Sequence, residues 1–246
     1  MQPVISLKNI TKTFADHPDE HLEALSNVNL EILGGEFFIF VGPSGSGKST
    51  LLRIMSGLEK SYSGSVTLAP GMSQNDMSFV FQQFALFPWL TVAENIGFGL
   101  IARRLPPAQQ HRIIADELKR FGLEKFAHAH PHELSGGMRQ RVGVARALAT
   151  SPKILFMDEP FSELDSFTAA ELRGELLTIW QERKPTVIMV THMIEDAVEL
   201  ADRIAVLTPR PGRIERIVEN RLPRPREKRS GGFYKLEDEI YKIIKP

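Results

Sequence analysis

An apolar run, FFIFV (37–41), leads directly into the glycine-rich stretch GPSGSGKST (42–50), and a helix-like sequence, STLLRIM (49–55), follows. The run is continuous rather than alternating, as in strands that are buried on both faces of a parallel sheet. A strand, a glycine-rich loop and a helix in this order build phosphate sites, because backbone N–H groups and the helix N-terminus converge on the loop. The stretch therefore predicts an α/β fold with a phosphate-binding loop.

The rest of the chain has two kinds of strand pattern. Strand-like runs at 153–160, 185–192 and 203–208 alternate with helix-like segments, which indicates a parallel sheet flanked by helices. Residues 4–10 and 25–33 instead alternate apolar and polar side chains, as half-buried strands do. We therefore expect an α/β core that is preceded by a separate β region.

A mostly helical stretch interrupts the α/β pattern after Gln82. Thr91, with Glu94 three residues later, has the spacing of an N-terminal capping box. Pro106 and Gly122 are typical of the start and the end of a second helix. We expect an inserted helical subdomain over about 83–150.

Composition limits the possible functions. Lys and Arg together number 30, as do Asp and Glu, so the chain has no net charge and nucleic acid is not an expected partner. The absence of cysteine excludes disulfides and thiolate chemistry. We find neither an apolar run of about 18 residues nor a signal-peptide pattern, so a role at a membrane would require a separate membrane partner.

The glycine-rich stretch matches the nucleotide-binding pattern G-x-x-x-x-G-K-[ST]. Its glycines permit a tight turn whose N–H groups converge on phosphates, Lys48 would reach the β- and γ-phosphates, and Ser49 would bind Mg²⁺. The alternative is an ordinary Gly/Ser turn, which the flanking strand and helix disfavour. We predict an ATP site at Gly42, Pro43, Ser44, Gly45, Ser46, Gly47, Lys48, Ser49 and Thr50.

Two acids end the apolar strand ILFMDEP (154–160), at the sheet edge where α/β proteins bind ligands. We expect Asp158 to hold Mg²⁺ directly or through water, and Glu159 to act as the general base for the attacking water. The alternative is a solvated acidic turn, and the phosphate-binding loop upstream argues against it.

Three further residues are candidates with open alternatives. His192 ends the strand VIMVTH (187–192) and would contact the γ-phosphate or orient the water, unless it is structural. Gln82 follows the strand SFVF (78–81) and would contact Mg²⁺ or the water, unless it is a turn residue. Phe14 would stack on adenine, unless it fills the core.

A second helix start that suits an anion lies at ELSGGMRQRVGVARA (133–147), where Ser135, Gly136 and Gly137 precede a helix-like segment. Met138 and Val142 begin an apolar face of helical spacing, which predicts that the helix packs into the core and leaves its start outward. One ATP does not need two such sites in one chain.

This set of motifs resembles the ATP-binding subunits of ABC transporters. LSGGM (134–138), followed by DEP (158–160), carries the resemblance, and GPSGSGKST is similar to the family's Walker A motif and ILFMDE to Walker B. Gln82 then resembles the Q-loop glutamine, SELD (162–165) the D-loop, His192 the switch histidine and Phe14 the adenine-stacking aromatic.

The resemblance covers about residues 4–215 and implies a fold and an assembly. The implied fold is a P-loop NTPase core with a parallel sheet flanked by helices, an N-terminal antiparallel β subdomain and an inserted α-helical subdomain. It implies an ABC ATPase domain at 1–220, with a basic linker and a C-terminal helix at 221–246. In the implied homodimer each ATP lies between the P-loop of one chain and Ser135, Gly136 and Gly137 of the other, with Asp165 also at the nucleotide.

Two longer segments, 84–100 and 205–214, resemble the ATPases of nitrate, sulfonate and taurine importers. This likeness implies ATP-driven import through an integral membrane permease at the cytoplasmic face of the membrane, with a solute-binding protein as an indirect partner. Glu163 departs from the family, which usually has Ala there. A soluble ABC ATPase of DNA repair or translation is the alternative, and the basic run 221–229 is a solvated linker or a lipid or partner contact.

Overall fold

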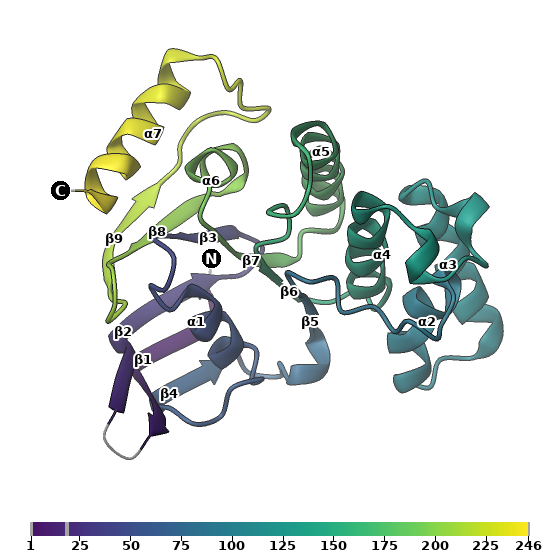
Figure 1. Ribbon diagram of the computed structural model, residues 1–246, viewed down its shortest axis with the longest axis horizontal. Helices are drawn as coiled ribbons and strands as arrows, with labels where there is room; N and C mark the ends of the chain where they lie inside the picture. The colour runs from purple at the N-terminus through teal and green to yellow at the C-terminus, as the bar shows by residue number, and fades with distance from the viewer. Residues whose placement is uncertain (1, 18–19, 246) are drawn as a thin grey trace.

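The central sheet of the computed structural model, which describes residues 2–17 and 20–245, has the strand order β5-β6-β7-β3-β8-β9 (Figure 1). Neighbouring strands from β5 to β8 are parallel, and β9 pairs with β8 in the antiparallel sense. The predicted parallel sheet is thus confirmed, with an antiparallel edge strand added to it. The strands are β3 (Phe37–Val41), β5 (Met77–Val80), β6 (Ile154–Asp158), β7 (Thr186–Thr191), β8 (Arg203–Leu207) and β9 (Ile214–Glu219).

Strand β3 joins two hydrophobic cores, one on each face of the sheet. Phe37, Ile39 and Val41 belong to one core, and Phe38 and Phe40 belong to the other. Successive side chains of a strand point to opposite faces, so a continuous apolar run is required where both faces are covered. On one face lies α1 (Lys48–Met55), and on the other lie α5 (Ser166–Arg183) and α6 (Ile194–Leu200) (Figure 1).

The N-terminal strands form a second sheet with the order β2-β1-β4, and both of its pairings are antiparallel. This confirms the antiparallel β subdomain. Its strands are β1 (Pro3–His17), β2 (Glu20–Leu33) and β4 (Ser63–Leu68). Apolar side chains of β1 and β2 share a core with α1, so this sheet packs on the α1 side of the central sheet.

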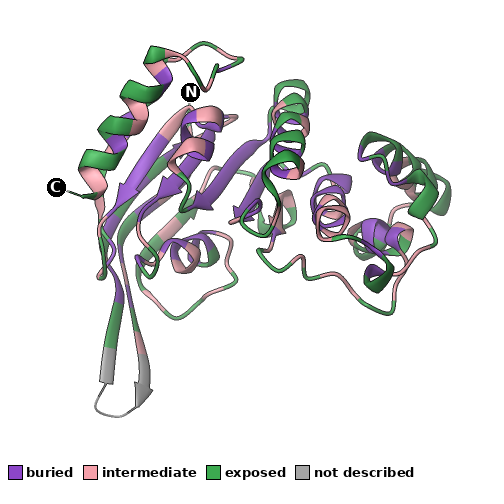
Figure 2. Cartoon of the chain, turned by 45° about the horizontal axis from the view of Figure 1, so that its top comes forward, coloured by how far each residue is buried: buried purple, intermediate pink, exposed green. Residues whose placement is uncertain are grey.

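Helices α2 (Val92–Ala102), α3 (Pro107–Arg120) and α4 (Gly136–Ala149) form the lobe at the right of Figure 1. The predicted capping box is confirmed, because Thr91 Oγ1 accepts from the Glu94 N–H and Glu94 Oε2 accepts from the Thr91 N–H. The outer surface of the lobe is exposed, whereas most of α4 is buried (Figure 2). The domain limits at about 83–150 and at 220 stay a prediction.

The basic run 221–229 is anchored at some residues and exposed at others, which corrects the interpretation as a wholly solvated linker. Arg226 is buried, and its guanidinium donates to the carbonyls of Val198 and Glu199 at the end of α6. Lys228 pairs with Glu195 and Glu199 on the same helix, at 2.6 and 3.0 Å. The run therefore fastens α6 to the C-terminal helix.

That C-terminal helix, α7 (Gly231–Ile244), lies over the β8–β9 edge, beside α6 (Figure 1). Phe233 and Ile240 bury its apolar face in the same core as the helices on that side of the sheet. No helix within the described residues is long and apolar enough to cross a membrane.

Candidate active site

The glycine-rich loop lies between β3 and α1 and has the backbone that its glycines permit. Gly45 and Gly47 have φ values of 78° and 85°, in the left-handed region that side chains disfavour. A Cβ on Gly47 would lie 2.7 Å from Leu25 Cδ2 and 2.8 Å from the Ala24 carbonyl. The β2 strand thus packs too closely against the loop for any other residue at this position.

The interior of the loop suits an anion. Lys48 is only 4% exposed, and its Nζ donates to the carbonyls of Gly42 and Pro43 at 2.9 and 3.0 Å. Burial lowers the pKa of Lys48, while the nearby charges of Glu159 and Asp158 oppose that shift. Ser46 Oγ is buried and has no hydrogen-bond partner among the described residues. A triphosphate would supply acceptors for both groups, so the loop fits the predicted ligand.

Asp158 lies at the end of β6, directly beneath the start of α1. Ser49 Oγ donates to Asp158 Oδ1 at 2.6 Å, and Arg53 Nη2 lies 3.8 Å from Asp158 Oδ2. Burial raises the pKa of Asp158, an effect that the Ser49 hydrogen bond and the Arg53 charge reduce. A hydroxyl and a carboxylate therefore converge at one point, which suits Mg²⁺ with phosphate and water as its other ligands.

Among the described residues, no group of three His, Cys, Asp or Glu side chains could hold a metal by itself. Of the three predicted Mg²⁺ ligands, Ser49 and Asp158 meet, whereas Gln82 is exposed elsewhere. The pair of Ser49 and Asp158 is incomplete without oxygens from a nucleotide. This is the usual arrangement for Mg²⁺, which keeps several waters and binds through one or two carboxylates and substrate phosphates.

Glu159 and His192 come together from adjacent strands. Glu159 follows β6 with a φ of 44°, and its N–H donates to the Val190 carbonyl of β7 at 3.0 Å. His192 follows β7, and its Nδ1 lies 2.9 Å from Glu159 Oε2. The parallel pairing of β6 and β7 brings their carboxyl ends to one edge, as the sequence analysis expected.

A cavity of about 250 Å³ opens over the loop. Phe14 lines it and is only half-buried, with Lys12 Nζ 4.5 Å from its ring centroid, so Phe14 does not fill the core. Gln82 is exposed two residues after β5 and does not line this cavity. The lining residues are Phe14, Leu22, Ala24, Ser44, Gly45, Ser46, Gly47, Lys48, Ser49, Thr50, Glu159 and Arg210.

Sequence reasoning missed three members of this cavity: Leu22 and Ala24 of β2, and Arg210. Arg210 Nε donates to the Gly45 carbonyl at 3.3 Å, although the two residues are 165 positions apart. The only signal in the sequence is the turn RPGRI (210–214), which gives no indication of what the turn contacts.

The Ser-Gly-Gly helix start lies in a different cavity, of about 380 Å³, that has no lining residue in common with the first. Ser135 Oγ accepts from the Met138 N–H and so caps α4. Asp165 Oδ1 accepts from the Phe167 and Thr168 N–H groups and caps α5. The lining residues are Ser135, Gly136, Gly137, Met138, Arg141, Glu163, Leu164, Asp165, Thr168 and Glu171. The two helix starts that suit an anion, those of α1 and α4, therefore lie in separate cavities of the subunit.

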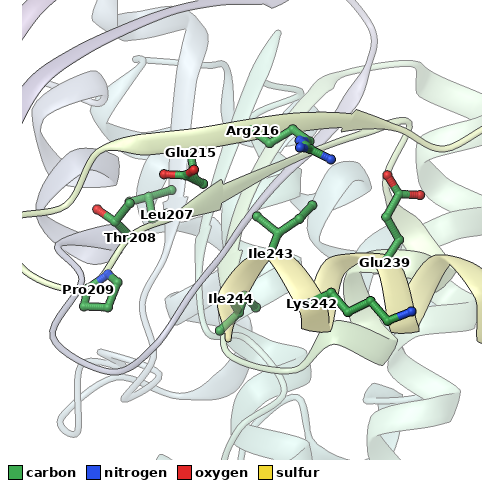
Figure 3. Close-up of a pocket in the computed structure, with 9 residues that line it drawn as sticks. All are labelled: Leu207, Thr208, Pro209, Glu215, Arg216, Glu239, Lys242, Ile243 and Ile244. Atoms are coloured by element: carbon green, nitrogen blue, oxygen red, sulfur yellow. The ribbon is translucent and has the colours of Figure 1, made fainter. Parts of the chain in front are cut away.

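A third cavity, of about 540 Å³, lies between α7 and strands β8 and β9 (Figure 3). It mixes apolar side chains with charges of both signs and contributes no residue to the cavity over the loop. Its lining residues are Leu207, Thr208, Pro209, Glu215, Arg216, Glu239, Lys242, Ile243 and Ile244.

Comparison with known proteins decides the family. The family model described as ABC transporter matches residues 25–162, more than half of the chain. The chain belongs to the ABC transporter family. It is an ATP-binding cassette, and its activity is ATP hydrolysis coupled to transport.

Curated relatives match this ABC ATPase over nearly its whole length. An uncharacterised ABC transporter ATP-binding protein of Methanocaldococcus jannaschii is 45% identical, over 100% of this chain and 92% of that one. The aliphatic sulfonates import ATP-binding protein of Bacillus cereus is 38% identical, over 96% and 94%. The bicarbonate transport ATP-binding protein of Synechococcus elongatus is 42% identical, over 98% of this chain and 38% of that one.

Solved ABC cassettes have the same fold as this ABC ATPase. The dimeric structure of a bacterial ABC transporter cassette has a TM-score of 0.79 and 38% identity, and the match covers 89% of this chain and all of that one. A dimeric post-hydrolysis cassette bound to ADP and phosphate has a TM-score of 0.78 at the same identity and coverage.

Proposed function

We propose that this ABC ATPase energises solute import through a separate membrane permease, and that the solute is a small anion of the nitrate, sulfonate or taurine type. The named functions of the Bacillus and Synechococcus relatives support import and an anionic solute. The observation that carries the catalytic part is the Glu159–His192 contact of 2.9 Å, beside a cavity lined by the phosphate-binding loop.

Nucleotide binding is assigned to the cavity over the loop. The loop N–H groups and Lys48 hold the phosphates, and Phe14 stacks on the adenine. Ser49 and Asp158 hold Mg²⁺, and Gln82 would join them only if its loop moved toward the cavity, because it is exposed outside it. A bound Mg²⁺ would neutralise phosphate charge.

Hydrolysis is assigned to the pair at the carboxyl edge of the sheet. Glu159 accepts the proton of the attacking water, since it is the carboxylate that lines the cavity among the residues described there. His192 orients Glu159 through its Nδ1, and its own position beside β7 places it at the same edge. Glu159 would thus position the water at the terminal phosphate, and His192 would keep Glu159 in place.

We propose further that the chain works as a head-to-tail homodimer. The structure of one subunit supports this because Ser135, Gly136 and Gly137 lie in a cavity that is separate from the loop and is open to a second molecule. The solved relatives described as dimeric support it independently. Each ATP would then contact the loop of one subunit and the α4 start of the other, with Asp165 nearby.

The permease would bind at the aromatic segment after Gln82. Trp89 is 71% exposed, and Phe98 and Ile101 of α2 are 45% and 60% exposed. Phe87 contacts both Trp89 and Phe98, with ring centroids 5.7 and 4.4 Å apart, so the aromatic side chains form one surface. An exposed apolar cluster of this kind marks a protein interface. The chain would lie peripherally at the cytoplasmic face of the membrane, with a solute-binding protein as an indirect partner.

Membrane fractionation of native cells tests the transport assignment. The tagged chain should be recovered with membranes and should co-purify in detergent with an integral membrane protein. Trp89→Glu should abolish that recovery while the purified chain still hydrolyses ATP. Recovery of the wild type with nucleic acid or ribosomes in the soluble fraction would favour the alternative, a soluble ABC ATPase of DNA repair or translation.

A further inference from the structure

Two exposed side chains of opposite charge lie at the two cavities that the proposed dimer brings together. Glu163 lines the cavity of the α4 start, and Arg210 lines the cavity over the phosphate-binding loop. Neither side chain forms an ion pair with any other side chain that the structure describes. A charge that pairs with no side chain in the described part of the subunit is available to a second subunit.

The other acids at the α4 cavity are already engaged. Asp165 accepts hydrogen bonds from the backbone at the start of α5 and from Thr168 Oγ1, at 2.7 to 3.1 Å. Glu171 pairs with Arg141 at 2.9 Å. Glu163 is exposed in the loop before α5 and is therefore the acid that can turn outward from this surface.

The turn between β8 and β9 holds Arg210 against the phosphate-binding loop. The Gly212 N–H donates to the Ala24 carbonyl at 3.0 Å, and the Gly212 carbonyl accepts from the Ser26 N–H at 3.0 Å. Arg210 Nε contacts the Gly45 carbonyl, and Nη2 lies 3.1 Å from the place that a Gly45 Cβ would occupy. The turn therefore places the guanidinium beside the loop.

The second cation of this cavity points away from solvent. Lys48 is 4% exposed and donates to carbonyls inside the loop, whereas Arg210 is exposed. Arg210 is thus the cation that this side of the interface can offer to a partner. Its planar guanidinium suits a carboxylate, because it can donate two parallel hydrogen bonds.

We propose that Glu163 of one subunit forms an ion pair with Arg210 of a second copy of this chain in the ATP-bound dimer. This proposal rests on the head-to-tail arrangement proposed above, in which the α4 cavity of one subunit faces the loop cavity of the other. In this arrangement Ser135 of one subunit contacts the nucleotide in the loop of the second copy. Glu163 lines the same cavity as Ser135, so it comes close to Arg210 of the second copy. Because the dimer would be two-fold symmetric, the ion pair between Glu163 and Arg210 would form twice, once at each nucleotide site.

The pair gives a physical role to Glu163, which is exposed in the loop before α5. A carboxylate that approaches a bound triphosphate is repelled, and a guanidinium between them removes that cost. Such a contact at the rim of an interface is screened by salt. The dimer should therefore weaken as the salt concentration rises.

Charge reversal in a hydrolysis-deficient background tests the pair. In Glu159→Gln at saturating ATP, analytical ultracentrifugation gives the dimer dissociation constant. Glu163→Arg and Arg210→Glu should each weaken the dimer about tenfold or more, because like charges then face one another. The double variant should return to within about threefold of its parent, because the pair is rebuilt with its charges exchanged.

Neighbouring residues on β9 supply matched controls. Glu215→Arg and Arg216→Glu reverse exposed charges that lie outside both cavities, so they should leave the dissociation constant unchanged. Fluorescent-ATP binding to each single variant shows whether the substitution has damaged the loop. In the double variant, Glu163→Arg would restore a lost contact but would not repair a damaged loop.

The ion pair would be wrong if the single reversals left the dissociation constant unchanged, or if the double variant dimerised as weakly as the two single losses combined. Either result would leave the proposed dimer unaffected. If the Glu159→Gln parent bound ATP and remained monomeric, the head-to-tail arrangement would be wrong, and the ion pair with it. The two failures are distinguishable in the same experiment.

Discussion

His192 Nδ1 and Glu159 Oε2 lie 2.9 Å apart at the carboxyl edge of two parallel strands, β7 and β6. The contact orients the Glu159 carboxylate, which lines the same cavity as Lys48 and the phosphate-binding loop. A carboxylate that is fixed close to the expected terminal phosphate can accept a proton from water without first reorganising. This relationship is the basis of the first prediction.

Glu159→Gln should bind ATP with nearly wild-type affinity and lose hydrolysis by at least about 10²-fold, because an amide keeps the shape of the side chain but cannot accept the proton. Phosphate release measures the rate, and fluorescent-ATP titration measures the affinity. Asp238→Asn on α7, an exposed acid outside the cavity, serves as the control and should hydrolyse ATP normally. Near-normal turnover in Glu159→Gln would remove Glu159 as the base.

Ser135→Arg should abolish ATP-dependent dimerisation without affecting ATP binding to the monomer. Ser135 lies outside the cavity over the loop, so a long cation there obstructs the approach of a second subunit. Loss of the α4 cap lowers stability by about 1 kcal/mol but leaves that cavity intact. Size-exclusion chromatography of the variant in the Glu159→Gln background is the measurement. Ser65→Arg, at an exposed serine of β4, should dimerise like its parent. A persistent ATP-dependent dimer in Ser135→Arg would contradict the proposed arrangement.

Gly47→Ala should lose ATP binding and lower the free energy of unfolding by about 1–3 kcal/mol, because it places a side chain at a φ of 85°. The added methyl would also lie 2.7 Å from Leu25 Cδ2. Gly174→Ala is the matched control, since it is exposed inside α5 with nothing within 4 Å of the added methyl. It should raise stability by about 0.5–1 kcal/mol. Urea unfolding and ATP titration of both variants give the comparison, and wild-type behaviour of Gly47→Ala would disprove the prediction.

Asp196 should make folding stability depend on pH. It is buried on α6 and accepts from Arg173 at 2.9 Å, and the charged groups around it are Arg173, Glu199, Lys228 and Glu195. Burial raises its pKa from 3.8 to about 6, against the opposing charge of Arg173. The folded state therefore holds a proton that the unfolded chain has released between these values. Stability should fall as pH rises through that window, by at most about 3 kcal/mol, and stay level above it.

Asp196→Asn carries no such proton, so its stability should lack this step. Urea unfolding at about pH 4 and about pH 7 measures the step in each protein, and subtracting the two profiles cancels the titration of groups that do not interact with Asp196. Parallel profiles in wild type and variant would show that Asp196 does not titrate in this range.

Short-range patterns in the sequence predicted much of the fold. The strand, the glycine-rich loop and α1 are specified by burial of a continuous apolar run and by glycines at positive φ, both of which are local requirements. The same holds for the Thr91–Glu94 capping box, which needs only three-residue spacing. The acids after β6 and the histidine after β7 were placed correctly because parallel strands end at one edge.

Only the tertiary structure decided the contacts between segments that are distant in the sequence. Nothing local to Arg210 indicates that it binds the Gly45 carbonyl, 165 residues away, because that contact depends on how the β8–β9 turn docks on the loop. The basic run 221–229 has the composition of a solvated linker, yet Arg226 and Lys228 fasten α6, since packing brings carbonyls and acids to them. The sequence thus specified which groups were available for chemistry, and the stacking of the layers determined which of them meet.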